Sequence, residues 1–280
     1  MAADLFVIDG VLPVLAEATG ISVYDFNFRS FLPCKHPFGV DTVEGVVARV
    51  GAFDDYEARY EALRAEGITL LHSPAEHVRA STLPGWYPLL KGLTPKSVWF
   101  DDAPSAAEVE GALGWPVFIK GARQTNRHRR STSIARSAAE FEAVMRAWAD
   151  DPVLNWQQVV CREYVELRPV EDPDPDRIPS SFEFRFFCWR GEPVGAGRYW
   201  WQGVDYAVTE RERLDAQRIA REAALRVSVP FVVVDVAQAI DGRWLVIECN
   251  DGQESGYAGA SPFGLWQRIV DAEREHLATG

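Results

Sequence analysis

Two β-rich runs near the C-terminal end of the chain decide the fold. They are Phe231-Val-Val-Val-Asp-Val-Ala-Gln-Ala-Ile240 and Arg243-Trp-Leu-Val-Ile-Glu-Cys-Asn250, and Asp241-Gly242 joins them. An Asp-Gly pair between two such runs predicts a tight β-hairpin with a two-residue loop. In that register Ile240 faces Arg243, and the other residue pairs follow in step along the two strands.

This register places Asp235 directly opposite Glu248, with Asn250 two residues further along the same face. Two carboxylates that face each other across a ladder repel unless a cation lies between them. Oxygen ligands from Asp, Glu and Asn suit Mg²⁺, which normally keeps waters and nucleotide phosphates among its ligands. The sequence therefore predicts a magnesium-nucleotide site, and the alternative is an edge hairpin with solvated acids. Solvation is the weaker explanation because most neighbours expected on that face are apolar: Phe231, Val233 and Val246.

The composition indicates a folded globular protein with two or three subdomains. The chain has 280 residues, of which 47% are hydrophobic and 25% are charged. Its net charge of −12 argues against a general nucleic-acid binder and against a polybasic membrane anchor. Its four cysteines form no C-x-x-C pair, so neither a zinc site nor a disulfide framework is suggested. Without a signal-peptide pattern or an apolar segment of bilayer length, we expect a cytoplasmic protein.

Alternating strand-like and helix-like segments in the first third predict a small α/β domain. Leu93-Thr-Pro-Lys96 then breaks the pattern and indicates a linker. The segments expected before it are a strand at Leu5–Ile8, a helix-like stretch at Val11–Ala18, a helix at Phe53–Glu66, a strand at Ile68–Leu71 and a helix opened by Ser73-Pro74.

A second series of elements follows the linker. A further hairpin is expected around Arg190–Pro193, between strands at Phe182–Trp189 and Val194–Trp201. The other elements expected here are helices at Ser105–Leu113, Ala138–Asp150 and Glu210–Arg226, strands at Val117–Lys120 and Gln158–Leu167, and a polar loop at Gly121–Ser133.

Lys120 ends an apolar strand, where a firmly held ammonium group can contact a phosphate. The loop after it offers arginines to the same anion and forms a local basic patch on an acidic chain. The alternative is an ordinary solvated loop. The arginines concerned are Arg123, Arg127, Arg129 and Arg130.

The second hairpin also carries candidate residues. Glu183 and Arg185 share one face of its first strand. If Gly191-Glu192 is the turn, Arg185 lies opposite Arg198, and paired arginines call for an anion such as a transferring phosphoryl group or a carboxylate. The alternative is that the arginines form salt bridges with nearby glutamates.

Two further sets of polar residues are weaker candidates. The backbone of the Val159–Glu166 segment could bond an adenine edge while Glu163 or Glu166 takes a ribose hydroxyl, although either could be an ordinary edge-strand charge. The five histidines show no metal-ligand spacing, and we expect His72 and His77, which flank a Pro, to lie on the surface. The common phosphate-binding, dinucleotide-binding and hydrolase motifs are absent.

Taken in order, these segments resemble the ATP-grasp superfamily, and within it the carboxylate–amine ligases such as the glutamate ligases that extend protein tails. The resemblance covers roughly residues 90–260. It implies an α/β (α+β) fold class with two α+β subdomains that clasp ATP after a small α/β N-terminal domain. The implied domains are residues 1–93, 94–165 and 166–280. The segments that carry the resemblance are Thr94-Pro-Lys96, Val117–Lys120, Val160–Glu166, Phe184-Arg185 with Gly197-Arg198, and Val234-Asp235 with Val246–Asn250.

The resemblance also implies a reaction. A carboxylate would be activated by ATP as an acyl-phosphate and then joined to an amine, from small-molecule or peptide substrates. A small-molecule kinase and a non-catalytic ATP-binding module are the alternatives, and the sequence leaves a homodimer open. The implied roles are contact with the ATP phosphates or adenine for Lys96 and Lys120, the adenine and ribose pocket for Arg162, Glu163 and Tyr164, Mg²⁺ binding for Asp235, Glu248 and Asn250, and support of the reacting groups for Arg185 and Arg198.

One departure from the family pattern concerns the loop after Lys120. Family members usually carry several glycines there, whereas this loop has only Gly121 and is rich in arginine. The loop is therefore a candidate for gripping an anionic second substrate. The segment beyond the metal ligands, residues 251–259, is where the family often binds its acceptor.

Overall fold

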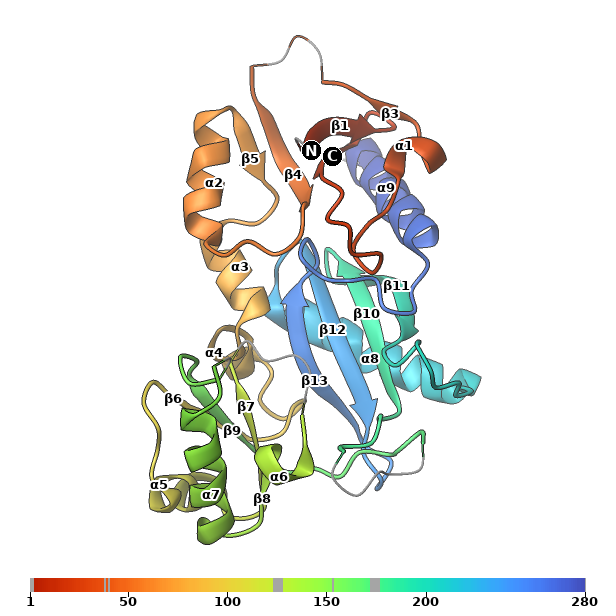
Figure 1. Cartoon of the computed structure of the whole chain (residues 1–280). Helices are drawn as coiled ribbons and strands as arrows, with labels where there is room; N and C mark the ends of the chain where they lie inside the picture. The colour runs from red at the N-terminus through yellow and green to blue at the C-terminus, as the bar shows by residue number, and fades with distance from the viewer. Residues whose placement is uncertain are drawn as a thin grey trace.

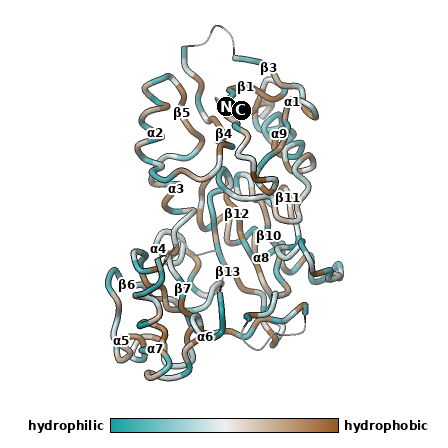
Figure 2. Tube along the Cα trace, viewed as in Figure 1, coloured by the Kyte–Doolittle hydropathy of each residue, from teal (hydrophilic) through white to brown (hydrophobic). Residues whose placement is uncertain are grey.

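The computed structural model describes residues 3–37, 39, 41–122, 128–152, 154–171 and 177–279. These residues form three β-sheets that follow one another along the chain, and both chain ends lie beside the first sheet (Figure 1). The helices carry both hydrophobic and hydrophilic residues (Figure 2), as expected for helices with one face on a sheet. Among the described helices, none has the length and apolarity needed to cross a membrane.

The first sheet has the strand order β3-β1-β2-β4-β5, in which β1 pairs antiparallel with β2 and β3, and β2, β4 and β5 run parallel. The helix-like stretch expected at Val11–Ala18 is wrong, because this stretch contains a strand. Asp9 and Gly10 adopt positive φ angles of 51° and 77° and turn the chain back along β1. The strands are β1 (Asp4–Ile8), β2 (Leu12–Ala16), β3 (Cys34–Lys35), β4 (Val43–Arg49) and β5 (Ile68–Leu70).

The helices around the first sheet begin at polar caps. The Asp55 side chain accepts the Ala58 N–H at the start of α2, and Ser73 forms a capping box with Glu76 at the start of α3. Both helices lie where the sequence predicts them. The elements are α1 (Phe28–Phe31), α2 (Tyr56–Ala65), α3 (Pro74–Ser81), α4 (Leu83–Trp86) and the 3₁₀ helix η1 (Tyr87–Leu89).

The second sheet, which we call the small sheet, has the order β6-β9-β7-β8 with antiparallel pairs. Its apolar side packs against α5 and α7 through Val109, Phe141, Val144 and Trp148. The expected loop at Gly121–Ser133 ends in a short helix, α6. The elements are β6 (Ser97–Phe100), α5 (Ala106–Leu113), β7 (Val117–Gly121), α6 (Arg130–Ser133), β8 (Ile134–Ala135), α7 (Ala138–Ala149) and β9 (Val159–Glu163).

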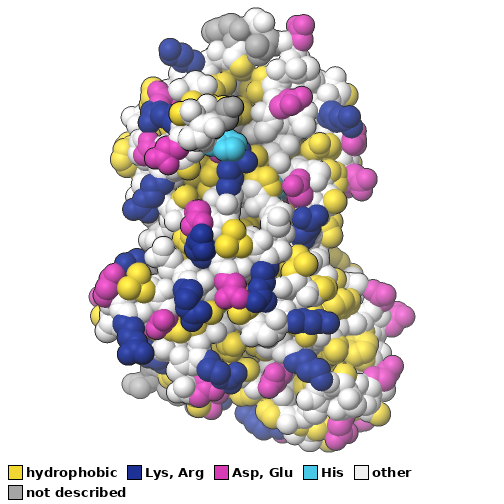
Figure 3. All heavy atoms as spheres, turned by 180° about the vertical axis from the view of Figure 1, so that it is seen from behind, with side chains coloured by type: hydrophobic (Ala, Val, Ile, Leu, Met, Phe, Trp, Pro, Cys, Tyr) yellow, Lys and Arg dark blue, Asp and Glu magenta, His cyan; other side chains and the backbone are white. Residues whose placement is uncertain are grey.

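The third sheet, which we call the central sheet, has the order β11-β10-β12-β13 and is antiparallel throughout. One face packs on the alanine-rich side of α8, and part of the other face packs on the first sheet and α9. On the side of the whole molecule that Figure 3 shows, acidic and basic side chains are interspersed. The elements are β10 (Glu183–Trp189), β11 (Glu192–Arg198), α8 (Glu210–Val227), β12 (Phe231–Gln238), β13 (Trp244–Asp251) and α9 (Pro262–Thr279).

The β12–β13 hairpin is present, but its turn differs from the expected one. Ala239 N–H bonds to Arg243 O, so the loop has three residues, with Gly242 at φ 88°. Ile240 therefore does not face Arg243. A bulge then inserts Ile247, so that Val236 pairs with Val246 while Asp235 pairs with Glu248. The opposition of the two acids is confirmed.

The bulge also moves Val246 to the other face of the sheet. Val246 packs with Val232, Val234 and Val236 in the cluster on the α8 side. The expectation that it shares a face with Asp235 is wrong, because one extra residue reverses the alternation of side chains in β13.

The β10–β11 hairpin turns one residue earlier than expected. Arg190 and Gly191 occupy the turn, both with positive φ, and Trp189 pairs with Glu192. A bulge at Val194 then shifts the pairing by one residue, so that Phe187 pairs with Gly195 and Arg185 pairs with Gly197. The expectation that Arg185 lies opposite Arg198 is wrong.

Candidate functional site

The site is a row of charged side chains across three neighbouring strands. Arg185 on β10 pairs with Asp235 on β12, which in turn pairs with Glu248 on β13. The Arg185 guanidinium and the Asp235 carboxylate form a bidentate pair: Nε donates to Oδ1 at 2.8 Å and Nη2 donates to Oδ2 at 2.7 Å. From the small sheet, Lys120 donates its Nζ to Glu248 Oε1 at 2.8 Å. Each carboxylate therefore has a cationic partner from the chain itself.

The row lies where the central sheet changes from apolar to polar. On this face one end carries Phe187, Trp189, Phe231 and Val233, which pack on the first sheet and α9. The other end carries the charged row and meets the small sheet through Lys120. Because Lys120 comes from a different sheet, the site joins two separate parts of the fold.

A short segment, Leu93–Ser97, holds the small sheet against the edge of β13, and we call it the strap. Val246 N–H donates to Leu93 O, and Thr94 Oγ1 donates to Val246 O, both at 2.8 Å. Arg162 of β9 reinforces this contact by donating to Ile247 O at 2.8 Å and to Thr94 Oγ1 at 2.7 Å. The strap and Arg162 therefore bond β13 at Val246 and Ile247, directly before Glu248.

Burial and charge shift the proton affinities of the row in different directions. Burial acts to raise the pKa of Glu248, but the charge and hydrogen bond of Lys120 outweigh it and hold the pKa below its usual value. Burial raises the pKa of Asp235 against the opposing attraction of Arg185. Burial also lowers the pKa of Arg162 to about 10. The row is thus a desolvated set of charges, in which electrostatic interactions are stronger than in water.

Glu183 lies on the same face of β10 as Arg185, two residues away, and is 5% exposed. Ser181 Oγ donates to its Oε2 at 2.6 Å. Burial, followed by the charge of Asp235, raises the pKa of Glu183 to about 8. This carboxyl group is therefore mainly protonated at neutral pH.

His128 belongs to the surroundings of the site, although no sequence pattern selects it. Its ring packs edge-on against Phe118, and its Nδ1 lies 3.4 Å from Ser133 Oγ. Burial, and next the charge of Lys120, lower the pKa of His128 to about 4. The imidazole of His128 therefore lies close enough to Lys120 and Glu248 for both charges to affect its pKa. A lone histidine in a loop has no sequence signature of this placement.

The family comparison agrees with this architecture. A family model described as an ATP-grasp domain matches residues 102–269. The chain belongs to this ATP-grasp family. The match contains Lys120, Arg185, Asp235 and Glu248, so the whole charged row lies within the family's domain.

Solved structures with the same fold are distant in sequence. A RimK domain ATP-grasp protein from Sphaerobacter thermophilus is 12% identical with a TM-score of 0.54, covering 83% of this chain and 81% of that one. A D-alanine–D-alanine ligase from Bacillus anthracis is 13% identical with a TM-score of 0.55, covering 87% and 83%. The ATP-grasp ligase PsnB, solved with a minimal precursor, Mg and ADP, is 15% identical with a TM-score of 0.51, covering 82% and 77%. No curated protein matches the sequence. These structures show that the chain has the ATP-grasp fold.

The residues expected to bind Mg²⁺ fit that ion by their chemistry. Asp235, Glu248 and Asn250 offer two carboxylates and an amide, which supply oxygen ligands. The ligand atom of Asn250 would be its Oδ1, because the amide nitrogen can only donate; Nδ2 is buried and has no hydrogen-bond partner in the described part of the chain. The described residues contain no cluster of three or more His, Cys, Asp or Glu side chains able to hold a metal, and accordingly the third ligand here would be an amide.

The residues expected around the nucleotide occupy different settings. Lys96 is exposed, and its Nζ donates to Ala112 O at 2.5 Å. Arg162 is buried and is engaged with the strap and β13. The Glu163 side chain is exposed at the end of β9, while the Tyr164 N–H bonds to Pro116 O at 3.2 Å. Their contact with a nucleotide stays a prediction.

Arg198 lies away from the row. It pairs with Phe184, packs over the Tyr206 ring, and forms an ion pair with Asp205. Phe184 and Tyr206 belong to the cluster on the α8 side of the sheet. Arg198 is therefore on the opposite face from Arg185, and only Arg185 is brought to the two acids.

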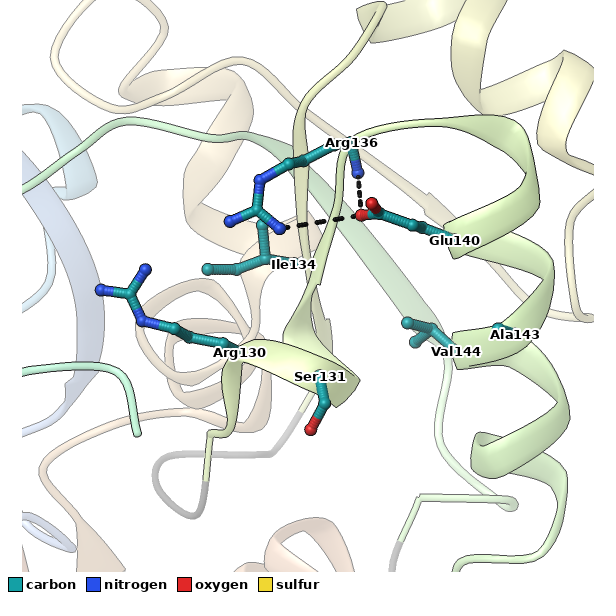
Figure 4. Close-up of a pocket in the computed structure, with 7 residues that line it drawn as sticks. All are labelled: Arg130, Ser131, Ile134, Arg136, Glu140, Ala143 and Val144. Atoms are coloured by element: carbon teal, nitrogen blue, oxygen red, sulfur yellow. Dashed lines mark hydrogen bonds and ion pairs between the residues drawn. The ribbon is translucent and has the colours of Figure 1, made fainter. Parts of the chain in front are cut away.

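The arginine-rich loop is described in part. Arg123 and Arg127 lie outside the described residues. Arg130 lines a hollow of about 390 Å³ between α6 and α7 together with Arg136, whose backbone N–H and guanidinium both face the Glu140 carboxylate (Figure 4). Arg129 is exposed.

Proposed function

We propose that the protein is an ATP-dependent ligase that activates a carboxylate as an acyl-phosphate and joins it to an amine. The observation that carries this proposal is the row Arg185–Asp235–Glu248–Lys120, in which two cations and two acids meet at the junction of two sheets; Lys120 and Asp235 are buried, and Arg185 and Glu248 are mostly buried. Membership of the ATP-grasp family supports ATP as the nucleotide. The fold shared with a D-alanine–D-alanine ligase and with the PsnB ligase supports a bond-forming reaction.

In the first proposed step, a substrate carboxylate oxygen attacks the γ-phosphorus of ATP. An O–P bond forms, the bond to the β-phosphate oxygen breaks, and ADP leaves. Lys120 is suited to hold a phosphate oxygen because the residue is only 7% exposed and desolvated charges interact strongly. Its bond to Glu248 would then be shared with the phosphate.

In the second step, the amine nitrogen attacks the acyl carbon, the amine loses a proton, and inorganic phosphate leaves. Negative charge collects on the acyl oxygen and on the leaving phosphate. Arg185 is placed to stabilise this charge because its guanidinium is fixed at both ends, by Asp235 and by Gly256 O at 3.1 Å. A fixed cation needs no reorganisation as the charge develops.

We propose Mg²⁺ as the metal, held by Asp235, Glu248 and Asn250. When bound, it would neutralise charge on the transferring phosphoryl group. The chain's own cations remain necessary in this scheme, since the phosphates of ATP carry more negative charge than one divalent ion compensates.

An acyl-phosphate can be trapped directly. The protein is incubated with ATP, MgCl₂ and a panel of carboxylic acids in the presence of hydroxylamine, without amine. We expect a hydroxamate to form together with ADP and phosphate, and Glu248→Gln to form none. A stable phosphorylated product that hydroxylamine does not intercept would indicate a small-molecule kinase instead. Tight ATP binding without turnover on any acceptor would indicate a non-catalytic module.

Domain organisation and location are part of the same proposal. The three sheets span residues 4–70, 97–163 and 183–251, and we propose boundaries near 93/94 and 165/166 between an N-terminal domain and two ATP-grasp subdomains. The substrates proposed are a small-molecule or peptide carboxylate and an amine, acted on in the cytoplasm.

A further inference from the structure

A second polar cluster lies at the other end of β12 and β13, and it centres on a fully buried histidine. His72, between β5 and α3, is 0% exposed, which contradicts the surface position that the sequence suggested. Phe231 N–H donates to His72 Nε2 at 3.1 Å, and His72 Nδ1 lies 2.8 Å from Asp251 Oδ2. His77 Nδ1 lies 3.1 Å from the same oxygen.

These contacts fix the tautomer of His72. A backbone N–H can only donate, so Nε2 of His72 must accept and carries no proton. The ring proton is then on Nδ1 and is donated to Asp251. One neutral imidazole thus bridges the first residue of β12 and the last residue of β13.

The buried Asp251 carboxylate has several hydrogen-bond partners. It is 1% exposed, and besides the two histidines it accepts the Gln253 N–H at 2.8 Å. Burial acts to raise its pKa, but the histidine contacts outweigh this effect and keep the pKa below its usual value. Both histidines come from the part of the chain that holds the first sheet, and Gln253, which follows β13, joins that sheet by accepting the Ala48 N–H of β4 at 3.1 Å.

The cluster adjoins the proposed metal site directly. Asp251 follows Asn250 in β13, and Asn250 pairs with Val233 while Asp251 pairs with Val232. Asn250 Nδ2 has no hydrogen-bond partner in the described structure. The backbone position of Asn250, which Asp251 anchors, therefore has a large part in setting where the amide lies.

We propose that His72 is a positioning residue for Asn250: by bridging Phe231 N–H and the Asp251 carboxylate, it lets the first sheet set the geometry of the proposed Mg²⁺ site. The inference rests on the proposed function, because it concerns the metal ligand assigned there. His72 itself touches neither nucleotide nor metal in this scheme. Partners that orient a metal ligand typically contribute about 10- to 100-fold to metal affinity.

Two substitutions separate the two bonds of the ring. In His72→Asn the amide can take the place of Nδ1 and still donate to Asp251, whereas the acceptor for Phe231 is lost. In His72→Gln the longer amide can reach the place of Nε2 and accept from Phe231, whereas the donor to Asp251 is lost. Tyr56→Phe is the matched control, because its hydroxyl donates to His72 O at 2.9 Å and accepts from Gln253 Nε2 at 3.1 Å in the same buried network, without a bond to β12 or β13.

The measurement is the apparent Mg²⁺ affinity of each purified full-length variant, from calorimetric titrations of a non-hydrolysable ATP analogue at graded MgCl₂. Amide hydrogen exchange over residues 231–233 and 249–251 is followed in parallel without metal. We expect His72→Gln to weaken the apparent Mg²⁺ affinity by about 10- to 100-fold and to speed exchange at 249–251. His72→Asn should affect Mg²⁺ less and speed exchange at 231, and Tyr56→Phe should match the wild type in Mg²⁺ affinity.

Two results would overturn the inference while leaving the proposed function intact: a folded His72→Gln variant with wild-type Mg²⁺ affinity, or an equal loss in Tyr56→Phe. The second result would mean that any damage to this interface has the same effect. If the wild-type protein bound no Mg²⁺-nucleotide, the proposed function would fail first and the role of His72 with it. Should His72→Gln not fold, Asp251→Asn tests the same bridge, since it keeps the side-chain size and removes the charge that His72 binds.

Discussion

Replacing Glu183 with Gln should change how the stability of the protein depends on pH. The folded state raises the pKa of Glu183 to about 8, whereas an unfolded chain leaves a glutamate near 4.5. Between these two values the folded protein holds a proton that the unfolded chain has released. The stabilisation is complete below pH 4.5 and is lost as the pH rises towards 8.

The size of the effect follows from proton linkage. One proton of difference lowers the free energy of unfolding by about 1.4 kcal/mol for each pH unit. Glu183→Gln has no proton to release, so it lacks this slope. Between about pH 5.5 and about pH 7.5, the stability of the variant relative to wild type should therefore rise by about 2–3 kcal/mol.

Urea unfolding followed by tryptophan fluorescence at several pH values in this interval measures the difference. Glu248→Gln is the control at the same site, because the lowered pKa of Glu248 leaves that carboxylate ionised in both states over the whole interval. Its stability should keep most of the wild-type pH slope, because Glu183 still titrates and the charge of Glu248 comes after burial and Asp235 among the causes that raise the Glu183 pKa. Parallel curves for Glu183→Gln and wild type would refute the reasoning and mean that Glu183 is ionised in the folded protein.

Three further substitutions test the site. Glu248→Gln should leave the circular dichroism spectrum unchanged and abolish magnesium-dependent turnover; a fully active variant would remove Glu248 from the site. Lys120→Met should weaken ATP binding by at least about tenfold in calorimetry, since a buried phosphate would lose its counter-charge, and the exposed Lys91→Met should bind ATP normally. Gly197→Ala should destabilise the protein by about 1–3 kcal/mol in urea unfolding, because the added Cβ would overlap the backbone at Ala260; wild-type stability there would mean that this segment can move aside.

The sequence predicts the pairing of Asp235 with Glu248 correctly, although the expected turn is wrong. The loop contains one more residue than expected, and the bulge at Ile247 restores the register before Glu248 is reached. Alternation along a strand is a strong constraint, but it cannot reveal an inserted residue. That is why the sequence pattern puts Val246 on the wrong face.

The sequence does not mark the β1–β2 and β10–β11 turns clearly enough to predict them correctly. Asp9-Gly10 has the same dipeptide as Asp241-Gly242, and it turns β1 into β2 where a helix is expected. Arg190-Gly191 adopts positive φ at both residues without any Asn or Asp, so the predicted turn is displaced by one residue. A bulge at Val194, which the sequence does not reveal, then puts Arg198 on the face opposite Arg185.

Contacts between distant segments are what sequence patterns cannot supply. Lys120 is predicted to meet a phosphate, yet its bond to Glu248, 128 residues away, follows only from the fold. The contact of His72 with Asp251 spans 179 residues and gives no local signal. Motif spacing finds residues that share a strand or a hairpin, while the meeting of two sheets is set by packing.

The bonds between the strap and β13 determine which shortened forms of the protein would leave a sheet edge exposed. β13 is the last strand of its sheet, and the strap occupies the free N–H and carbonyl of Val246 on its outer side. A fragment limited to the family-matched residues 102–269 would lack the strap, and the edge of β13 would be free to pair with other molecules. This fragment would also lack the first sheet, which covers Phe187 and Phe231, so restoring residues 93–101 should remove only the part of its self-association that occurs by β-pairing at the β13 edge.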